Sequence, residues 1–170
     1  MPNPKQHVLF LDFDGVLHPD AVYLSRHGPT LRTEGDLFMW APNLERLLEQ
    51  FPTVSLVLST SWVRHLGFKR ATKYLPGPLS SRVVGATWHS TMAKDWADED
   101  KWDGRTRYDQ ISRYASRSNL TSWISVDDDP EGWSQEAISH LVVCDSMRGL
   151  GDVSTLCSLE ERLTEMVARR

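Results

Sequence analysis

The sequence contains little cysteine and no long apolar run. Its two cysteines, Cys144 and Cys157, lie 13 positions apart with no second pair, which excludes a disulfide framework and a zinc site. We expect both thiols to be buried or half-buried. The longest apolar run, Leu37 to Ala41, has five residues, far below the roughly 20 that a membrane-spanning helix needs. The segment from Met1 to His7 lacks the apolar core of a signal peptide, so we expect a cytoplasmic protein without a membrane segment.

The chain also lacks an excess of positive charge. Nineteen Lys and Arg residues against 23 Asp and Glu residues give a net charge of −4, which excludes a generally basic surface that coats nucleic acid. A local cluster, Arg64, Lys69, Arg70 and Lys73, could attract a polyanion or form a solvated helix face. With 40% hydrophobic and 25% charged residues and no internal repeat, the composition is typical of a globular chain. We expect residues 1–170 to form one domain.

Short apolar runs alternate with helical patterns along the chain. Runs typical of buried strands occupy residues 8–11, 54–58, 82–84, 123–126 and 141–144. Between and after them, apolar residues recur at helical spacing over residues 42–51, 63–75, 108–115 and 156–167. This alternation predicts an α/β fold with three α/β/α layers, Rossmann-like, around a mostly parallel sheet.

Two segments interrupt the alternation. Residues 18–40 contain Gly28-Pro29 between apolar positions and indicate a small hairpin flap rather than a helix. Residues 87–104 form a long loop whose tryptophans could stack on a base or pack the loop down. Neither segment is long enough for a large cap domain.

Acidic and hydroxyl residues follow three of the predicted strands. Asp12-Phe13-Asp14-Gly15 follows the first, Ser59-Thr60-Ser61 the second, and Asp127-Asp128-Asp129 the run that ends at Val126. In an open parallel sheet the ligand crevice lies beyond these carboxyl ends. Clustered carboxylates repel one another unless a cation neutralises them, and oxygen ligands suit Mg²⁺. Gly15 allows a sharp turn beside an anion. The sequence therefore predicts a Mg²⁺ and phosphate site.

The same residues resemble a known family. Residues 9–17, with Asp12-Phe13-Asp14-Gly15-Val16, resemble the DxDG(T/V) signature of the haloacid dehalogenase (HAD) superfamily, and residues 56–61 and 124–130 resemble its second and fourth motifs. Residues 59–62 and 83–87 resemble more narrowly the small HAD domains without a large cap, in RNA-repair "Swiss army knife" proteins and in polynucleotide 3′-phosphatases. The glycine-rich loop of a kinase partner is absent.

This resemblance implies a role for each site residue. Asp12 would be the nucleophile that forms an aspartyl-phosphate, and Asp14 the general acid and base, with its backbone carbonyl on the metal. Because side chains alternate along a strand, we expect both to start on one face. Asp127 would bind Mg²⁺ directly with Asp128 in support, or the two would exchange roles. The Ser59 hydroxyl and the Thr60 amide would bind the phosphate.

The implied function is a Mg²⁺-dependent phosphohydrolase that acts on a phosphomonoester, either a small molecule or a nucleic-acid 3′ end. One departure from the family is the third motif, where no Lys occurs at the expected place. Arg107 is our choice for that cation, with Arg105 and Lys101 as alternatives. His18 and His89 are not assigned to the catalytic set. The oligomeric state stays open.

Two other classes of function remain as alternatives. A non-catalytic module could keep the fold and bind phosphate and Mg²⁺ without turnover, because the third-motif Lys is missing. A receiver-like phospho-acceptor domain would also gather acids at strand ends, but it needs a Lys late in the chain, and none follows Lys101.

Overall fold

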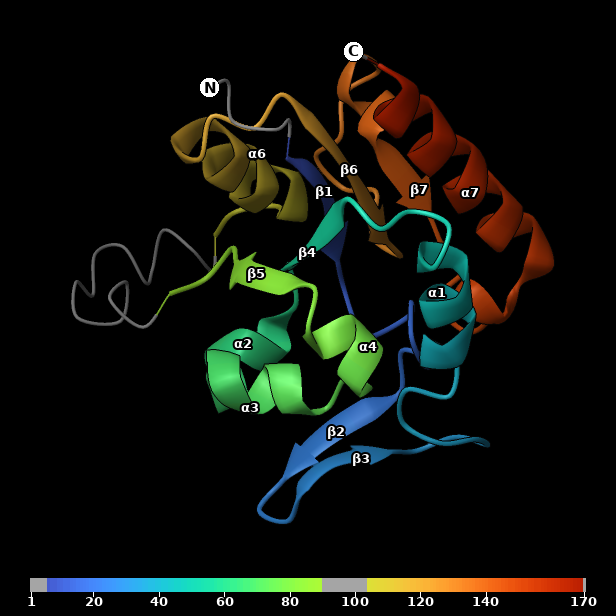
Figure 1. Cartoon of the computed structure of the whole chain (residues 1–170). Helices are drawn as coiled ribbons and strands as arrows, with labels where there is room; N and C mark the ends of the chain where they lie inside the picture. The colour runs from blue at the N-terminus through green and yellow to red at the C-terminus, as the bar shows by residue number, and fades with distance from the viewer. Residues whose placement is uncertain (1–5, 90–103, 170) are drawn as a thin grey trace.

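The computed structural model describes residues 6–89 and 104–169 (Figure 1). The strands are β1 (His7–Leu11), β2 (Val22–Ser25), β3 (Gly28–Leu31), β4 (Val54–Leu58), β5 (Val83–Ala86), β6 (Ser122–Asp127) and β7 (Leu141–Val143). The α-helices are α1 (Ala41–Leu48), α2 (Ser61–Leu66), α3 (Phe68–Lys73), α4 (Gly77–Ser80), α6 (Arg107–Arg117) and α7 (Val153–Ala168). Two short 3₁₀ helices, η2 (Ala137–His140) and η3 (Gly149–Gly151), complete these elements. In the described ranges, no helix has the length and apolar character needed to cross a bilayer.

Five strands form one parallel sheet in the order β5-β4-β1-β6-β7. β1 lies at the centre and pairs with β4 on one side and β6 on the other. Helices or loops connect the strands, as parallel pairing requires. The predicted α/β architecture with a mostly parallel sheet is confirmed.

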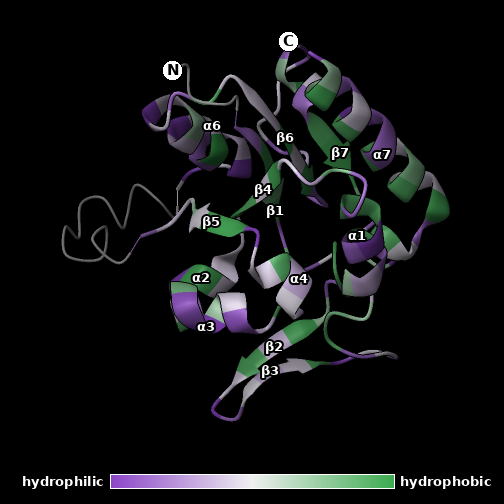
Figure 2. Cartoon of the chain, in the orientation of Figure 1, coloured by the Kyte–Doolittle hydropathy of each residue, from purple (hydrophilic) through white to green (hydrophobic). Residues whose placement is uncertain are grey.

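Alternation along the strands builds two cores, one on each face of the sheet. On β1, Leu9 and Leu11 belong to the larger core that α1 and α7 cover, whereas Val8 and Phe10 belong to the smaller core under α6. The ring of Phe10 meets the rings of Tyr114 and Trp123 edge-on at 5.6 and 5.5 Å between centroids. Figure 2 shows β4, β5 and β7 as largely hydrophobic, and α6 and α7 as carrying both hydrophobic and hydrophilic residues. The sheet is therefore the middle of three layers.

The β2–β3 hairpin is separate from the main sheet. Figure 1 shows it beyond the carboxyl end of β1, beside α2 and α3. The predicted hairpin is confirmed, but its paired residues cover only 22–31, and the turn falls at Arg26-His27 rather than at Gly28-Pro29. Residues 37–40 form a separate turn that leads into α1.

Three further predictions need correction. The helix expected over residues 63–75 is two short helices, because the chain turns at Gly67, whose φ of +86° favours glycine. The short strand expected at 82–84 lies at Val83–Ala86. Cys144 is buried as expected, but Cys157 is exposed on the outer side of α7. The alternative cation Lys101 and most of the 87–104 loop lie outside the described residues.

Candidate functional site

The register of the central strands brings the first and fourth motifs together. Leu11 of β1 is level with both Leu58 of β4 and Val126 of β6. The residues that follow, Asp12, Ser59 and Asp127, are therefore neighbours across the sheet edge. Their backbones continue the pairing, since Ser59 N donates to Leu11 O at 2.9 Å.

Three carboxylates form a compact acidic cluster at this edge. One oxygen each from Asp12, Asp127 and Asp128 lie within 4.8 Å of one another. Asp12 and Asp127 are buried and Asp128 is half-buried. Burial raises the pKa of Asp12 well above its usual range, and the neighbouring Asp127 adds to that effect. Burial and Asp127 likewise raise the pKa of Asp128, to about 7. Without a nearby cation, the ionised form of all three carboxyl groups is therefore disfavoured.

Arg107 connects the three strand ends. Its Nη1 donates to the Ser59 carbonyl, its Nη2 lies 3.8 Å from Asp12 Oδ1, and its Nε lies 3.2 Å from Asp127 Oδ2. Burial alone would lower the pKa of Arg107, but Asp12 and Asp127 raise it above its usual value. Arg107 is the first residue of α6, and Thr106 caps that helix by accepting a hydrogen bond from Asp109 N at 3.2 Å.

The structure brings Arg107, our choice for the third-motif cation, next to Asp12 and Asp127, and its replacement of the family lysine stays a prediction. Of the cations proposed for that role, Arg105 is half-buried ahead of α6, and within the described ranges it is Arg107 that pairs with Asp12 and Asp127. One guanidinium compensates only part of the charge of three carboxylates.

Ser59 and Thr60 join the site from the end of β4. Both are buried, and the Ser59 hydroxyl has no hydrogen-bond partner within the described part of the chain. A buried hydroxyl without a partner is energetically costly, and a phosphate oxygen would provide the missing partner. The Thr60 hydroxyl caps α2 by accepting from Trp62 N at 3.3 Å.

Asp14 lies apart from the acidic cluster. β1 ends at Leu11, so the strand alternation used to place Asp12 and Asp14 on one face does not extend to Asp14. Both carboxylate oxygens of Asp14 accept from Trp62 Nε1, at 3.2 and 3.0 Å. His18 Nε2 lies 2.9 Å from Asp14 Oδ1. Since Phe38 N donates to His18 Nδ1 at 3.1 Å, the proton of the neutral ring sits on Nε2 and points at Asp14.

Sequence reasoning missed these two partners of Asp14. His18 is outside the catalytic set expected from the sequence, yet it is fully buried and packs edge-on against Phe38 at 4.8 Å. The available signal was its position four residues after Asp14, across the turn that Gly15 makes. Trp62 contacts Asp14 from α2, and the sequence offered no signal that an indole would meet the first motif.

Position 15 requires glycine for two reasons, its backbone conformation and the closeness of Asp128. Its φ is +74°, and a Cβ at this position would come within 2.2 Å of Asp128 Oδ2. Any larger residue would therefore push Asp128 away from Asp12 and Asp127. The glycine of the first motif holds the acidic cluster together.

The fold and this arrangement of aspartates define a domain of the haloacid dehalogenase (HAD) type. A family model described as the HAD domain in Swiss Army Knife RNA repair proteins matches residues 8–154. The chain belongs to that family. No curated protein matches the chain.

The residues present fit a hard divalent cation. The three carboxylates supply oxygen ligands only, the type that Mg²⁺ prefers. Asp127 Oδ2 is fully buried, and within the described ranges it accepts no aligned hydrogen bond, although Arg107 Nε lies 3.2 Å away. An acidic site of this kind can hold a metal, and a bound cation would favour the ionised carboxylates that burial, together with neighbouring charges at Asp12 and Asp128, disfavours.

The raised pKa of Asp128 predicts a pH-dependent stability of the metal-free protein. In the unfolded chain Asp loses its proton near pH 4, whereas folded Asp128 keeps it until about pH 7. Its contribution to stability is therefore complete below pH 4 and is lost as the pH rises through 7. In the presence of a chelator, Tm should fall between pH 5 and pH 8. Mg²⁺ should raise Tm most at pH 8, where the carboxylates are ionised.

Thermal unfolding of the wild type and of Asp128→Asn, with chelator and with Mg²⁺, checks this expectation. The variant should show a flatter Tm profile and a smaller Mg²⁺ effect. A wild-type Tm that rises from pH 5 to pH 8 in chelator would contradict the electrostatic description of the cluster.

Proposed function

We propose that this protein is a Mg²⁺-dependent phosphohydrolase that removes the terminal phosphate of a phosphomonoester through an aspartyl-phosphate on Asp12. The observation that carries the proposal is the junction at the three strand ends. There a buried carboxylate, an arginine and an unpartnered serine hydroxyl lie side by side, with a second carboxylate on the following turn.

In the first step Asp12 attacks phosphorus. Phe13 N donates to Asp12 Oδ1 at 2.8 Å, which fixes the orientation of the carboxylate. A bond forms between a carboxylate oxygen and phosphorus while the bond from phosphorus to the alcohol oxygen breaks. Asp14 gives its proton to that leaving oxygen. Arg107 and the Ser59 hydroxyl stabilise the charge on the phosphoryl oxygens.

In the second step water hydrolyses the intermediate. Asp14, now ionised, accepts a proton from the attacking water, and the oxygen of that water bonds to phosphorus. The bond from Asp12 to phosphorus breaks, which restores the carboxylate and releases inorganic phosphate. Water is consumed and the alcohol is the other product, so Asp14 ends the cycle protonated as it began.

The metal would be held by Asp12, Asp127 and Asp128, with the Asp14 backbone carbonyl as a further ligand. When bound, Mg²⁺ supplies positive charge that neutralises the cluster and the substrate phosphate. The residues of the chain carry out the other tasks. Arg107 keeps Asp12 and Asp127 in place, and Gly15 leaves the space that Asp128 occupies.

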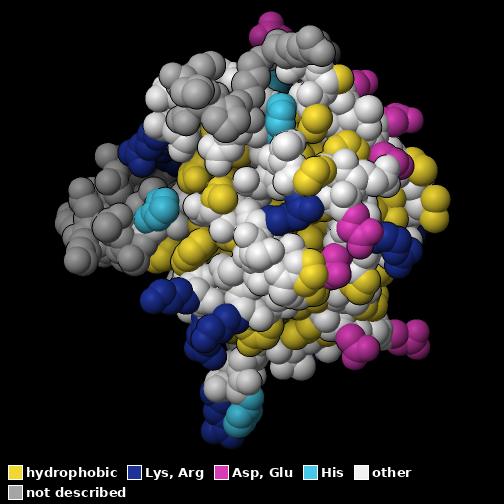
Figure 3. All heavy atoms as spheres, in the orientation of Figure 1, with side chains coloured by type: hydrophobic (Ala, Val, Ile, Leu, Met, Phe, Trp, Pro, Cys, Tyr) yellow, Lys and Arg dark blue, Asp and Glu magenta, His cyan; other side chains and the backbone are white. Residues whose placement is uncertain are grey.

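For the substrate we propose a nucleic-acid 3′ end. The family is named for RNA repair proteins, and α2 and α3 carry Arg64, Lys69, Arg70 and Lys73 within a stretch, residues 50–94, that has no Asp or Glu. Figure 3 shows Lys and Arg side chains over this side of the molecule and at the hairpin tip, while most Asp and Glu lie over α1 and α7. Such an uneven charge distribution attracts a polyanion despite the net negative charge.

Phosphate release from a panel of substrates tests the proposal. With Mg²⁺, the wild type should release phosphate from 3′-phosphorylated oligonucleotides faster than from sugar phosphates. The advantage should shrink as salt rises, because phosphate contacts are screened. A protein that binds Mg²⁺ and a phosphate analogue but turns over no phosphomonoester would instead be the non-catalytic module.

Trp62→Phe provides a sharper test of the acid–base role of Asp14. The substitution keeps an aromatic ring but removes the indole N–H that contacts both Asp14 oxygens. We expect kcat for an alkyl phosphate to fall about tenfold. The fall should be smaller for p-nitrophenyl phosphate, because a nitrophenolate needs little help from an acid.

Trp123→Phe is the matched control, since Trp123 packs against Phe10 in the core under α6. It should change Tm, and any change in kcat should be the same for both substrates. Equal losses of kcat on both substrates in Trp62→Phe would mean that Trp62 only supports the fold.

A further inference from the structure

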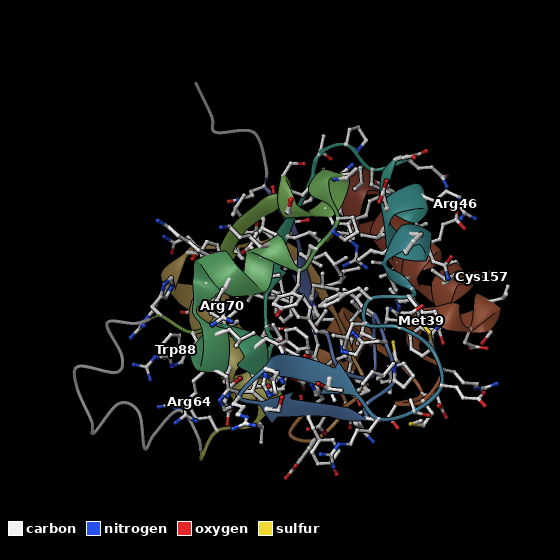
Figure 4. The ribbon with its side chains drawn as sticks, turned by 90° about the horizontal axis from the view of Figure 1, so that it is seen from below. Met39, Arg46, Arg64, Arg70, Trp88 and Cys157 are labelled. Atoms are coloured by element: carbon white, nitrogen blue, oxygen red, sulfur yellow. The ribbon has the colours of Figure 1, made fainter. Side chains whose placement is uncertain are left out.

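A cavity of about 170 Å³ lies between the hairpin and α2. Val22, Leu24 and Pro29 line it from the hairpin, and Trp62 and Leu66 line it from α2. Figure 4 views the molecule from the hairpin side, with α2 and α3 next to the hairpin. Apolar side chains thus form the hairpin wall and part of the α2 wall, while Asp14, Ser61 and His65 add polar groups to the lining.

Asp14 is also part of the wall of this cavity. In the proposed reaction Asp14 gives its proton to the leaving oxygen, which must lie within hydrogen-bond reach of its carboxyl group. The rest of the leaving alcohol has to extend from that oxygen. Asp12, which attacks phosphorus from the opposite side, does not line the cavity. The leaving group therefore has its space between the hairpin and α2.

We propose that this cavity is the subsite for the terminal nucleoside of a 3′-phosphorylated nucleic acid. The inference rests on the proposed function and adds where the substrate is recognised. Apolar walls suit a base and a ribose ring, whose contacts with such surfaces are tolerant of sequence. His65, exposed at the same cavity, offers a hydrogen-bonding ring at its edge.

The charges around the cavity favour a nucleic-acid strand over a neutral aromatic alcohol as the leaving group. Lys69, Arg70 and Lys73 are exposed on α3, which follows α2 directly. Figure 4 places Arg64 and Arg70 on this same side of the molecule. Cations next to an apolar cavity fit the alternation of rings and phosphates in a polynucleotide. A ringless phosphate would leave the apolar walls unfilled.

The hairpin supplies a matched pair of variants. Tyr23 and Leu24 are adjacent on β2, and each is 53% exposed. Neighbouring residues in a strand point to opposite faces. Leu24 lines the cavity, whereas the ring of Tyr23 lies under the guanidinium of Arg32, 3.8 Å from its centroid. Leu24→Glu places a charge in the cavity, and Tyr23→Glu places the same charge on the other face.

The test compares these variants on two substrates and in one binding assay. Leu24→Glu should raise KM for a 3′-phosphorylated oligonucleotide at least about tenfold. Its effect on kcat/KM for glycerol phosphate, whose alcohol is too small to fill the cavity, should be several-fold smaller. Tyr23→Glu should leave both substrates near the wild-type values. Binding is measured in an Asp12→Asn background with a fluorescently labelled 3′-phosphorylated oligonucleotide. Leu24→Glu should weaken this binding by a similar factor, and Tyr23→Glu should not.

The outcomes separate this inference from the proposed function. If the wild type hydrolyses phosphomonoesters but Leu24→Glu behaves like Tyr23→Glu, the subsite is wrong and the phosphatase stands. If no substrate is hydrolysed but Leu24→Glu alone weakens oligonucleotide binding, the subsite stands without the reaction. Equal losses on both substrates, or a mononucleotide bound as tightly as the oligonucleotide, would overturn the nucleic-acid assignment.

Discussion

Asp12→Asn should reduce Mg²⁺-dependent phosphate release by at least about 10⁴-fold, because it removes the nucleophile and leaves only binding and electrostatic effects. The same substitution should not harm the fold. Asp12 is buried beside Asp127, and burial together with this neighbour raises its pKa well above the usual range. A neutral amide of the same shape relieves that repulsion, so the metal-free variant should unfold at the wild-type Tm or above.

Asp129→Asn is the control for this prediction. Asp129 belongs to the same acidic run, but it is exposed, and its side chain accepts a hydrogen bond from Glu131 N at 2.9 Å. It should retain activity within about twofold, as surface substitutions away from a site generally do. Full activity in Asp12→Asn would remove Asp12 from the reaction. A loss of both activity and Tm would instead indicate a structural role.

Arg107→Ala should have the second largest effect, and it should affect both stability and activity. Without the guanidinium, Asp12 and Asp127 lose their cation at a buried position, a change that typically costs about 4 kcal/mol. In chelator, Tm should therefore fall by roughly 8–16 °C. Activity with Mg²⁺ should fall by about 10²-fold to 10³-fold, as when a donor to a transition-state oxygen is removed.

Arg107→Lys distinguishes charge from geometry and covers the case in which the alanine variant does not fold. Lys restores the charge, but its single amine cannot reach all three groups that Arg107 contacts, Ser59 O, Asp12 and Asp127. We expect activity and Tm between those of the wild type and of Arg107→Ala. Arg117→Ala, on the exposed end of the same helix, should change neither. Wild-type activity in Arg107→Ala would assign the third-motif role to another cation.

The fold could be predicted because its signals are local. Buried parallel strands require short continuous apolar runs, and the runs at 8–11 and 54–58 became β1 and β4 nearly residue for residue. The helix over 63–75 was wrong in one respect, since apolar periodicity continues across Gly67 while the backbone turns there. Periodicity reports which residues are buried, and it does not report a change in chain direction.

The site could be predicted in part for the same reason. Residues that follow parallel strands meet at one edge, so Asp12, Ser59 and Asp127 were placed together from the sequence. The contacts of Asp14 could not be placed, because they depend on how the chain turns after Gly15 and on which helix packs over that turn. Trp62 is brought there by the packing of α2, whereas His18 lies only four residues from Asp14 and meets it across the local turn.

The most direct test of the account is a search for the covalent intermediate. The wild type is mixed with Mg²⁺ and a 3′-phosphorylated oligonucleotide, quenched in acid during turnover, and digested for mass spectrometry. We expect one phosphoryl group on the peptide that carries Asp12, at a side chain that borohydride reduces as an acyl phosphate, and none in Asp12→Asn. Steady release of phosphate with no phosphorylation at Asp12, or with phosphorylation at another residue, would contradict it.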